Sequence, residues 1–374
     1  MNTTTTRYID IVRGALLVLV FQMHALYLFE STGGRTPDQY FWFQMVVKSL
    51  APQVAAFFIL AGMTSRQMLA KPFGHVLGRS LMLIVLAYVS HIVGVLMNAA
   101  LYEPWNGVRA LAHDIVKPLL HGTDLITAIA WFFIVLGIVR LLVYWTARNR
   151  LSLTVGVVLA VAIALLGRSE SIPYNFYEWQ NWPAAYLLFL FGMRVPTEWR
   201  MPAWLAVFVF WFVIGITLAN SPQLLSADPW PAFDAAFVSQ PMVGQYGLPP
   251  VYFTGVIFSF VFLFWFAQVT EATAIGRGLR YFGRASLQFL LLHGWVIVVV
   301  YPPLSLILPQ RQSIALFFLL FFGNMALHAA LYQILKKPLN KLISLIGTIT
   351  DVQAFRRRRL AGAGRSAARS AESS

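Results

Sequence analysis

Three ionisable side chains lie in the first apolar stretch of the chain: Asp10, Arg13 and His24. On an α-helix, the eleven residues from Arg13 to His24 turn the chain by about 1100°, which is about 20° beyond three full turns. Arg13 and His24 therefore share one helix face, about 16 Å apart at about 1.5 Å per residue. Asp10 precedes Arg13 by three residues, so the two side chains can meet on the same stripe.

These residue types suit different parts of one reaction. A histidine in an apolar environment disfavours its charged form, so His24 is expected to be neutral and able to act as a general base. A guanidinium group binds phosphate oxygens through two parallel hydrogen bonds, which makes Arg13 a candidate for holding a phosphorylated ligand. Structural roles are the alternative: Arg13 can reach the headgroup layer, and His24 can hydrogen-bond a neighbouring helix.

The elements that carry these residues are predicted to be membrane-spanning helices. Of the 374 residues, 59% are hydrophobic and 11% are charged, whereas soluble domains average about 25% charged residues. A helix crosses the hydrocarbon core with about 20 apolar residues. We therefore predict an all-α, polytopic transmembrane helix bundle of about ten spans in residues 1–345. The approximate ranges are 10–29, 43–63, 77–100, 124–146, 151–167, 183–195, 202–220, 249–270, 285–308 and 313–335.

The positions of the Lys and Arg residues predict the orientation of the bundle. With the N-terminus on the cytoplasmic side, 22 of the 28 Lys and Arg residues fall in inner segments, as the positive-inside rule requires. Both termini are therefore predicted to be cytoplasmic. Residues 346–374 include Arg356–Arg359 and few large apolar residues, so they are predicted to form a disordered basic tail. Its expected partner is anionic lipid headgroups, with no role for nucleic acid.

Several other kinds of site are excluded or only weakly indicated. The chain has no Cys, which removes disulfides and thiolate nucleophiles. It also has no Gly-rich phosphate loop, His-Glu-x-x-His run or serine nucleophile elbow, so no metal site is predicted. Segments 168–182 and 221–248 combine aromatic, amide and carboxylate side chains. They suit either a sugar-binding surface or an interfacial aromatic belt.

The ionisable residues of the first segment are part of a wider set of sequence motifs. Arg13 and His24 are separated by ten residues and preceded by Asp10. Less specific motifs are spread over the rest of the chain: Phe57–Gly62, Arg79, Trp131–Phe133 and Gly283–His293. Together these motifs resemble those of the acyltransferase 3 family of integral-membrane acyltransferases. Ala61 and Leu287 stand where that family usually has Ser and Tyr.

The resemblance implies an O-acyltransferase of the plasma (inner) membrane. Its donor would be a cytoplasmic acyl-CoA, either acetyl-CoA or succinyl-CoA, and its acceptor a hydroxyl on the outer side, on a carbohydrate or glycoconjugate. In this interpretation His24, assisted by Asp10, is the catalytic base, and Arg13 and Arg79 hold the phosphates of the donor. His293 is a weaker catalytic candidate, because it is a single imidazole in an apolar segment.

Two other functions are compatible with the same residues. In a secondary transporter, Asp10, Arg13 and His24 would form an ion-coupled path. A non-catalytic membrane component of glycan assembly would keep the helices without needing the Arg–His stripe. The remaining intramembrane histidines are interpreted as structural or left without a role: His91 is expected to make structural hydrogen bonds, and His328 has no ionisable partner near it in the sequence.

Overall fold

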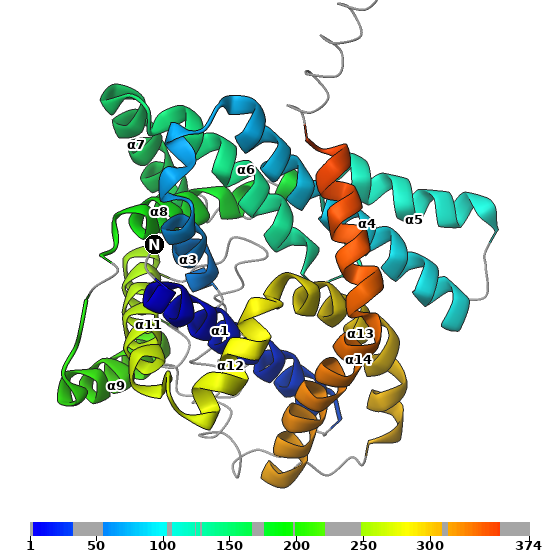
Figure 1. Ribbon diagram of the computed structural model, residues 1–374. Helices are drawn as coiled ribbons and strands as arrows, with labels where there is room; N and C mark the ends of the chain where they lie inside the picture. Colours follow the sequence, from blue (N-terminus) through cyan, green and yellow to red (C-terminus); the bar gives the residue numbers. More distant parts are fainter. Residues whose placement is uncertain are drawn as a thin grey trace, which may run out of the picture.

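The chain folds into packed helices, as a computed structural model shows (Figure 1). The structure describes residues 3–32, 55–102, 107–123, 125–127, 129–166, 176–196, 199–220, 248–308 and 313–351. All regular secondary structure in these residues is helical, which agrees with the predicted fold class. The helices are α1 (Thr3–Thr32), α3 (Ala56–Thr64), η2 (Arg66–Ala70), α4 (Phe73–Leu101), α5 (Val108–His121), α6 (Ala130–Thr146), α7 (Arg150–Leu166), η3 (Phe176–Asn181), α8 (Trp182–Arg194), α9 (Ala203–Ala219), α11 (Pro249–Thr270), α12 (Ala274–Arg284), α13 (Ser286–Ile307) and α14 (Ile314–Ile349).

Five helices are long and apolar enough to cross a membrane. These are α1, α4, α11, α13 and α14, and they coincide with five of the predicted spans. Four other predicted spans fall on α6, α7, α8 and α9, which have 17, 17, 13 and 17 residues. At about 1.5 Å per residue, these helices are shorter than a hydrocarbon core of about 30 Å. The predicted span at 43–63 lies largely outside the described residues, and its last part is α3.

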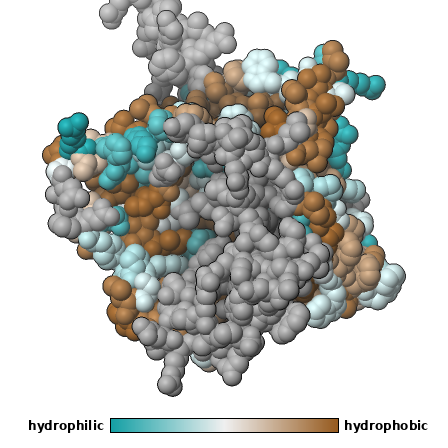
Figure 2. Space-filling view, turned by 180° about the vertical axis from the view of Figure 1, so that it is seen from behind, coloured by the Kyte–Doolittle hydropathy of each residue, from teal (hydrophilic) through white to brown (hydrophobic). Residues whose placement is uncertain are grey.

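The outer surface of the helices carries many large apolar side chains. Trp204 and Trp211 on α9 are 72% and 61% exposed, and Leu319 on α14 is 69% exposed. Figure 2 shows hydrophobic residues over much of the coloured part of one face of the molecule. Water would penalise an exposed apolar surface of this size, whereas lipid would not. The surface therefore supports assignment of the chain to the membrane proteins.

Helix α1 lies in the middle of the arrangement (Figure 1). In the most apolar 18-residue stretch of α1, 61% of the residues are buried. In the matching stretches of the other four long helices, the buried share is 28–44%. It packs against α11, α12, α13 and α14. The helix that carries Asp10, Arg13 and His24 is therefore surrounded by the elements that can supply partners for them.

Glycines set the closest helix contacts. Gly14 on α1 lies against the backbone of Leu279 on α12, and Gly283 on α12 lies against the backbone carbonyl of Asp10. Gly62 on α3 and the facing α8 backbone repeat this arrangement elsewhere in the fold. Small residues allow helix backbones to approach closely inside membranes. The contact between α1 and α12 therefore fixes the end of α1 that carries Asp10.

Parts of the predicted loops and tail are helical. The predicted inner segment between the spans at 249–270 and 285–308 contains α12. The Thr273 hydroxyl caps its first turn and accepts a hydrogen bond from the Gly276 N–H at 3.1 Å. Helix α5 occupies part of a predicted outer segment. Helix α14 continues through Pro338 to Ile349, so the predicted boundary at 345/346 falls inside a helix. Residues 352–374 of the predicted tail lie outside the described residues.

Candidate functional site

Three histidines from three helices form a hydrogen-bonded series. Nε2 of His293, on α13, lies 3.0 Å from Nδ1 of His24, on α1. Nδ1 of His293 lies 3.1 Å from Nε2 of His328, on α14. Nδ1 of His328 lies 2.7 Å from the carbonyl oxygen of Asn324, one turn earlier on the same helix. The series therefore runs from α1 through α13 to a backbone carbonyl of α14.

The partners determine which nitrogen of each ring carries a hydrogen. The Asn324 carbonyl oxygen can only accept, so Nδ1 of His328 donates. Nε2 of neutral His328 must then accept from Nδ1 of His293, and Nε2 of neutral His293 must accept from Nδ1 of His24. The same Nδ1 of His24 lies 3.0 Å from the Val20 carbonyl oxygen, which shares its hydrogen. The neutral series therefore places the lone pair of His24 on Nε2.

Aromatic packing holds this series in place. The Phe21 ring, three residues before His24, lies with its centroid 4.3 Å from the His328 ring and 5.0 Å from the His293 ring. His293 and His328 are 1% and 0% exposed. In addition, the Asn324 side-chain amide donates to the Phe21 carbonyl oxygen at 3.5 Å. The histidines thus occupy a closely packed region in which water does not separate them.

The series joins two residues predicted from the sequence to one that was left without a role. His24 and His293 were candidates on separate segments, and the structure brings them into direct contact. His328 was missed because its ring partner lies 35 residues away along the chain. The only local sign of its role is the i, i+4 spacing of Asn324 and His328 on one helix.

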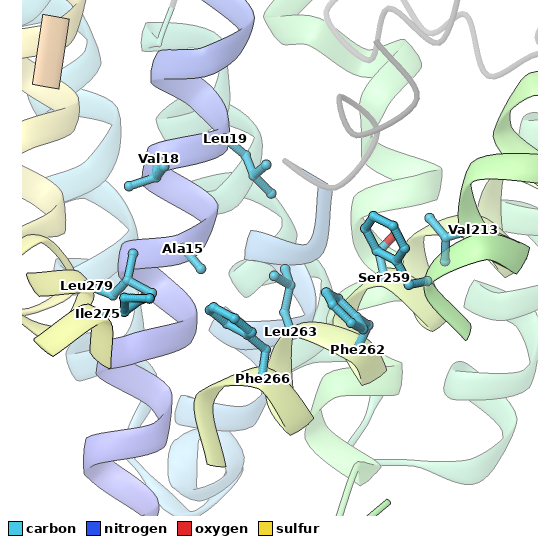
Figure 3. Close-up of a pocket in the computed structure, with 11 residues that line it drawn as sticks. Ala15, Val18, Leu19, Val213, Ser259, Phe262, Leu263, Phe266, Ile275 and Leu279 are labelled. Carbon is cyan, nitrogen blue, oxygen red and sulfur yellow. The ribbon is translucent and has the colours of Figure 1, made fainter. Parts of the chain in front are cut away.

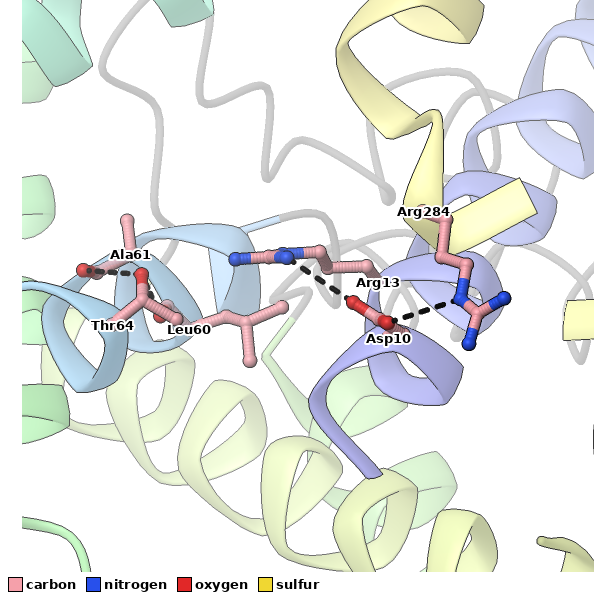
Figure 4. A network of polar contacts seen from close by, with 6 residues as sticks. All are labelled: Asp10, Arg13, Leu60, Ala61, Thr64 and Arg284. Carbon is pink, nitrogen blue, oxygen red and sulfur yellow. Dashed lines mark hydrogen bonds and ion pairs between the residues drawn. The ribbon is translucent and has the colours of Figure 1, made fainter. Parts of the chain in front are cut away.

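Asp10 is part of a separate ionic group (Figure 4). Its carboxylate lies 3.3 Å from Nη1 of Arg13 and 3.7 Å from Nε of Arg284, at the end of α12. The contact with Arg13 confirms the proximity expected from their three-residue spacing. Arg284 lies in the motif Gly283–His293, and the structure makes it a second partner of Asp10. The fourteen residues from Asp10 to His24 span about 21 Å of helix, so Asp10 does not contact His24.

Arg79 occupies a different place from Arg13. It is exposed and lines a cleft of about 290 Å³ between the start of α4 and the end of α14. His75, Ser344 and Thr348 line the same cleft, and Arg13 is not among its described lining residues. The two arginines predicted to hold one donor are therefore not brought into one cavity by the described residues.

A larger apolar pocket lies on the other side of α1. It has a volume of about 300 Å³ and is lined by side chains of α1, α9, α11 and α12 (Figure 3). Ala15, one of its lining residues, is about 200° around the helix from Arg13. None of the three histidines lines this pocket. Its lining is almost entirely apolar, so it offers no group for acid–base chemistry.

Other candidates have structural partners. His91 accepts a hydrogen bond from the Ile126 N–H at 3.1 Å and donates from Nε2 to the Asp114 carbonyl oxygen at 3.1 Å. These bonds satisfy the ring, as expected for a structural histidine. In the described part of segment 168–182, the buried Glu178 accepts a hydrogen bond from the Asn181 amide at 3.4 Å. Segment 221–247 lies outside the described residues.

The described residues contain no group of three or more His, Asp or Glu residues arranged to hold a metal ion. The three histidines bond to one another in series, and this leaves them without a common point for a cation. The fold and site thus define a helical membrane protein with a buried imidazole chain. A comparison with protein families, curated proteins and solved structures finds no match for this chain.

Proposed function

We propose that the protein is a membrane O-acyltransferase that moves an acetyl or succinyl group from cytoplasmic acyl-CoA to a hydroxyl of a carbohydrate at the outer side. The observation that carries the proposal is the series of three histidines, in which the lone pair of neutral His24 lies on Nε2. The motifs shared with the acyltransferase 3 family support it. The 22 of 28 basic residues in the predicted inner segments support cytoplasmic termini and an inner-membrane location.

In this mechanism Nε2 of His24 takes the proton of the acceptor hydroxyl as the hydroxyl oxygen bonds to the thioester carbonyl carbon. The carbon–sulfur bond then breaks, and the thiolate of CoA receives the same proton. The acyl group is transferred, and no oxidant, metal or second nucleophile is needed. Because only the acyl group moves from coenzyme A to the acceptor hydroxyl, the bulky anionic donor does not have to cross the membrane.

The second and third histidines would share the charge that forms on His24. Each Nδ1 hydrogen can move to Nε2 of the next ring, which shifts the positive charge from His24 toward His328. The series ends at the Asn324 carbonyl oxygen, which cannot be protonated under these conditions. The proton therefore returns to His24 when the thiolate needs it, and the series stores a proton without conducting it across the protein.

Asp10 and Arg13 would act at the other end of the same helix face. Asp10 holds the Arg13 guanidinium at 3.3 Å, and Arg284 gives the carboxylate a second cation. The carboxylate carries one charge and the two guanidinium groups carry two, so the group remains attractive to a phosphate of the donor. In this proposal Asp10 positions Arg13 and does not take part in proton transfer.

The proposal is tested by release of free thiol from acetyl-CoA and succinyl-CoA by the purified protein. We expect release to rise when mono- and oligosaccharides are added, with an equal amount of acyl-saccharide found by mass spectrometry. Absence of thiol release and of acyl-saccharide with both donors, in a preparation shown to be folded, would overturn it.

A secondary transporter is the second candidate, and the same histidine series favours it, because buried imidazoles also occur in proton-coupled carriers. Liposomes that contain the protein distinguish the two functions. A carrier would move protons or labelled sugar across the membrane without any donor, whereas an acyltransferase would leave the donor-free liposomes unchanged.

A further prediction concerns His328. His328→Phe fills the space but cannot accept the hydrogen of His293, so the protonated state of His24 loses support. A hydrogen bond to a charged group contributes about 1.5–3 kcal/mol, so we expect turnover per folded molecule to fall by about 10–150-fold. His328→Gln keeps an acceptor oxygen and should retain more activity. His91→Gln is the matched control, and an equal loss in that variant would show a structural effect only.

A further inference from the structure

Among the residues that the structure describes, Arg140, in the second half of α6, has one hydrogen-bond partner. Its Nη1 donates to the hydroxyl of Ser65 at 3.0 Å, and Ser65 is itself 7% exposed. The Nε of Arg140 is fully buried and has no partner. A buried guanidinium hydrogen without an acceptor is unfavourable. One side of this guanidinium group therefore lacks the acceptor that its burial requires.

Arg66 has the same deficiency. It follows Ser65 directly, and its Nε and Nη2 are both buried without a partner among the described parts of the chain. The sequence carried no sign of this, because Arg66 is simply one of the 22 basic residues in the predicted inner segments. Ser65 is thus linked to two arginines with unsatisfied donors: Arg66 follows it in the chain, and Arg140 donates to its hydroxyl.

Arg79 is a third cation in this part of the fold. It lies on α4 and directly precedes Ser80, whose carbonyl oxygen lies against Gly137, one turn before Arg140. Within the residues that the structure describes, the ion pairs of arginines join Arg7, Arg13 and Arg284 to Asp10 or Glu271, and none of these pairs includes Arg66 or Arg140. Like charges without counter-ions are expected to attract an anion.

Packing explains why these residues meet. Gly137, one turn before Arg140, lies against the Ser80 carbonyl of α4 and allows α6 to approach closely. One turn after Arg140, the Tyr144 hydroxyl donates to the Lys71 carbonyl oxygen at 3.1 Å. The last turns of α6 are therefore held against the link between η2 and α4, and Ser80 adds a buried hydroxyl without a partner.

We propose that Arg66 and Arg140, assisted by Arg79, form a binding site for a phosphate group where η2, α4 and α6 meet. A phosphate offers several acceptor oxygens to the planar guanidinium groups and carries the charge that three arginines would balance. Two sources have this chemistry: the nucleotide part of acyl-CoA and the headgroup of an anionic phospholipid. Only the first of these rests on the proposed acyltransferase function.

The test measures binding without turnover. Coenzyme A without an acyl group and adenosine 3′,5′-bisphosphate are titrated against the purified full chain in uncharged detergent. In parallel, the thermal midpoint is compared in bilayer discs with and without phosphatidylglycerol. Arg140→Gln and Arg66→Gln remove the charged guanidinium donors. Arg140→Lys keeps the positive charge but removes the planar pair of N–H donors. Arg150→Gln is the matched control, because Arg150 is an exposed cation at the start of α7.

For the donor, we expect Arg140→Gln to weaken binding of coenzyme A by roughly 10–150-fold, the effect of one lost charge-assisted hydrogen bond, and Arg150→Gln by less than about twofold. If the ligand is instead a phospholipid headgroup, phosphatidylglycerol should raise the thermal midpoint of the wild-type protein but not that of Arg140→Gln. Coenzyme A should then bind to neither protein. Unchanged binding of both ligands in the folded Arg66→Gln and Arg140→Gln variants would overturn the site. Because thiol release is not used, failure of the acyltransferase proposal would be seen separately.

Discussion

Replacement of His24 by alanine is expected to lower acyl transfer by about 10²–10⁴-fold per folded molecule, the usual contribution of a general base. The lone pair assigned to Nε2 of His24 would be lost. Nε2 of His328 cannot replace it, because it still accepts the hydrogen bond from His293, and Nε2 of His293, which loses its donor in this variant, lies one ring farther along the series. Donor binding should change little, because the arginines proposed to hold phosphate lie elsewhere. The measurement is turnover with acetyl-CoA, alongside coenzyme A binding and the thermal midpoint.

His24→Asn separates the catalytic role from a structural one. Its amide can still donate toward His293, so the buried acceptor nitrogen keeps a partner, but the amide is not a base. The catalytic interpretation predicts that His24→Asn is as inactive as His24→Ala and more stable. Wild-type turnover in either folded variant would end the assignment of His24 as the base and move that role to His293.

Replacement of Gly283 by alanine is expected to cause the largest loss of stability. A Cβ atom at this position would overlap the Asp10 carbonyl oxygen on α1, where the obstacle is backbone and cannot rotate away. Overpacking typically costs about 1–3 kcal/mol and occasionally more. The helices must separate to admit the methyl group, and this would also draw Arg284 away from the Asp10 carboxylate. We expect a lower thermal midpoint and a smaller monodisperse fraction after purification.

Gly278 provides the matched control for this prediction. It lies on the same helix and is exposed, and a Cβ atom added there would meet no other atom within 4 Å. Gly278→Ala should therefore be neutral or stabilising by up to about 1 kcal/mol, because alanine favours the helix. Equal stability of the two variants would show that α1 and α12 do not approach as closely as their glycines indicate.

The spacing of residues along the sequence was sufficient to predict which side chains of a single helix lie near one another. Hydropathy identified the apolar segments, and the five that form long helices agree with the structure. The period of 3.6 residues placed Asp10 beside Arg13, and the 3.3 Å ion pair confirms it. Such predictions succeed because positions on one helix are related by a fixed rise and rotation. The number of spans, the acyl group and the acceptor stay predictions.

Residue order alone was enough to establish that the chain is helical and apolar, and that α1 carries an acid, a guanidinium and an imidazole on one face. The packing of the helices was needed to show that His24 meets His293 and that His293 meets His328. It also showed that Arg284 shares Asp10, and that guanidinium nitrogens of Arg66 and Arg140 are buried without a partner in the described part of the chain. His24 and His293 are 269 residues apart in the chain. Their contact depends on which helices become neighbours, and that choice is made by packing between whole helix surfaces, including the glycine contacts, which no local spacing encodes.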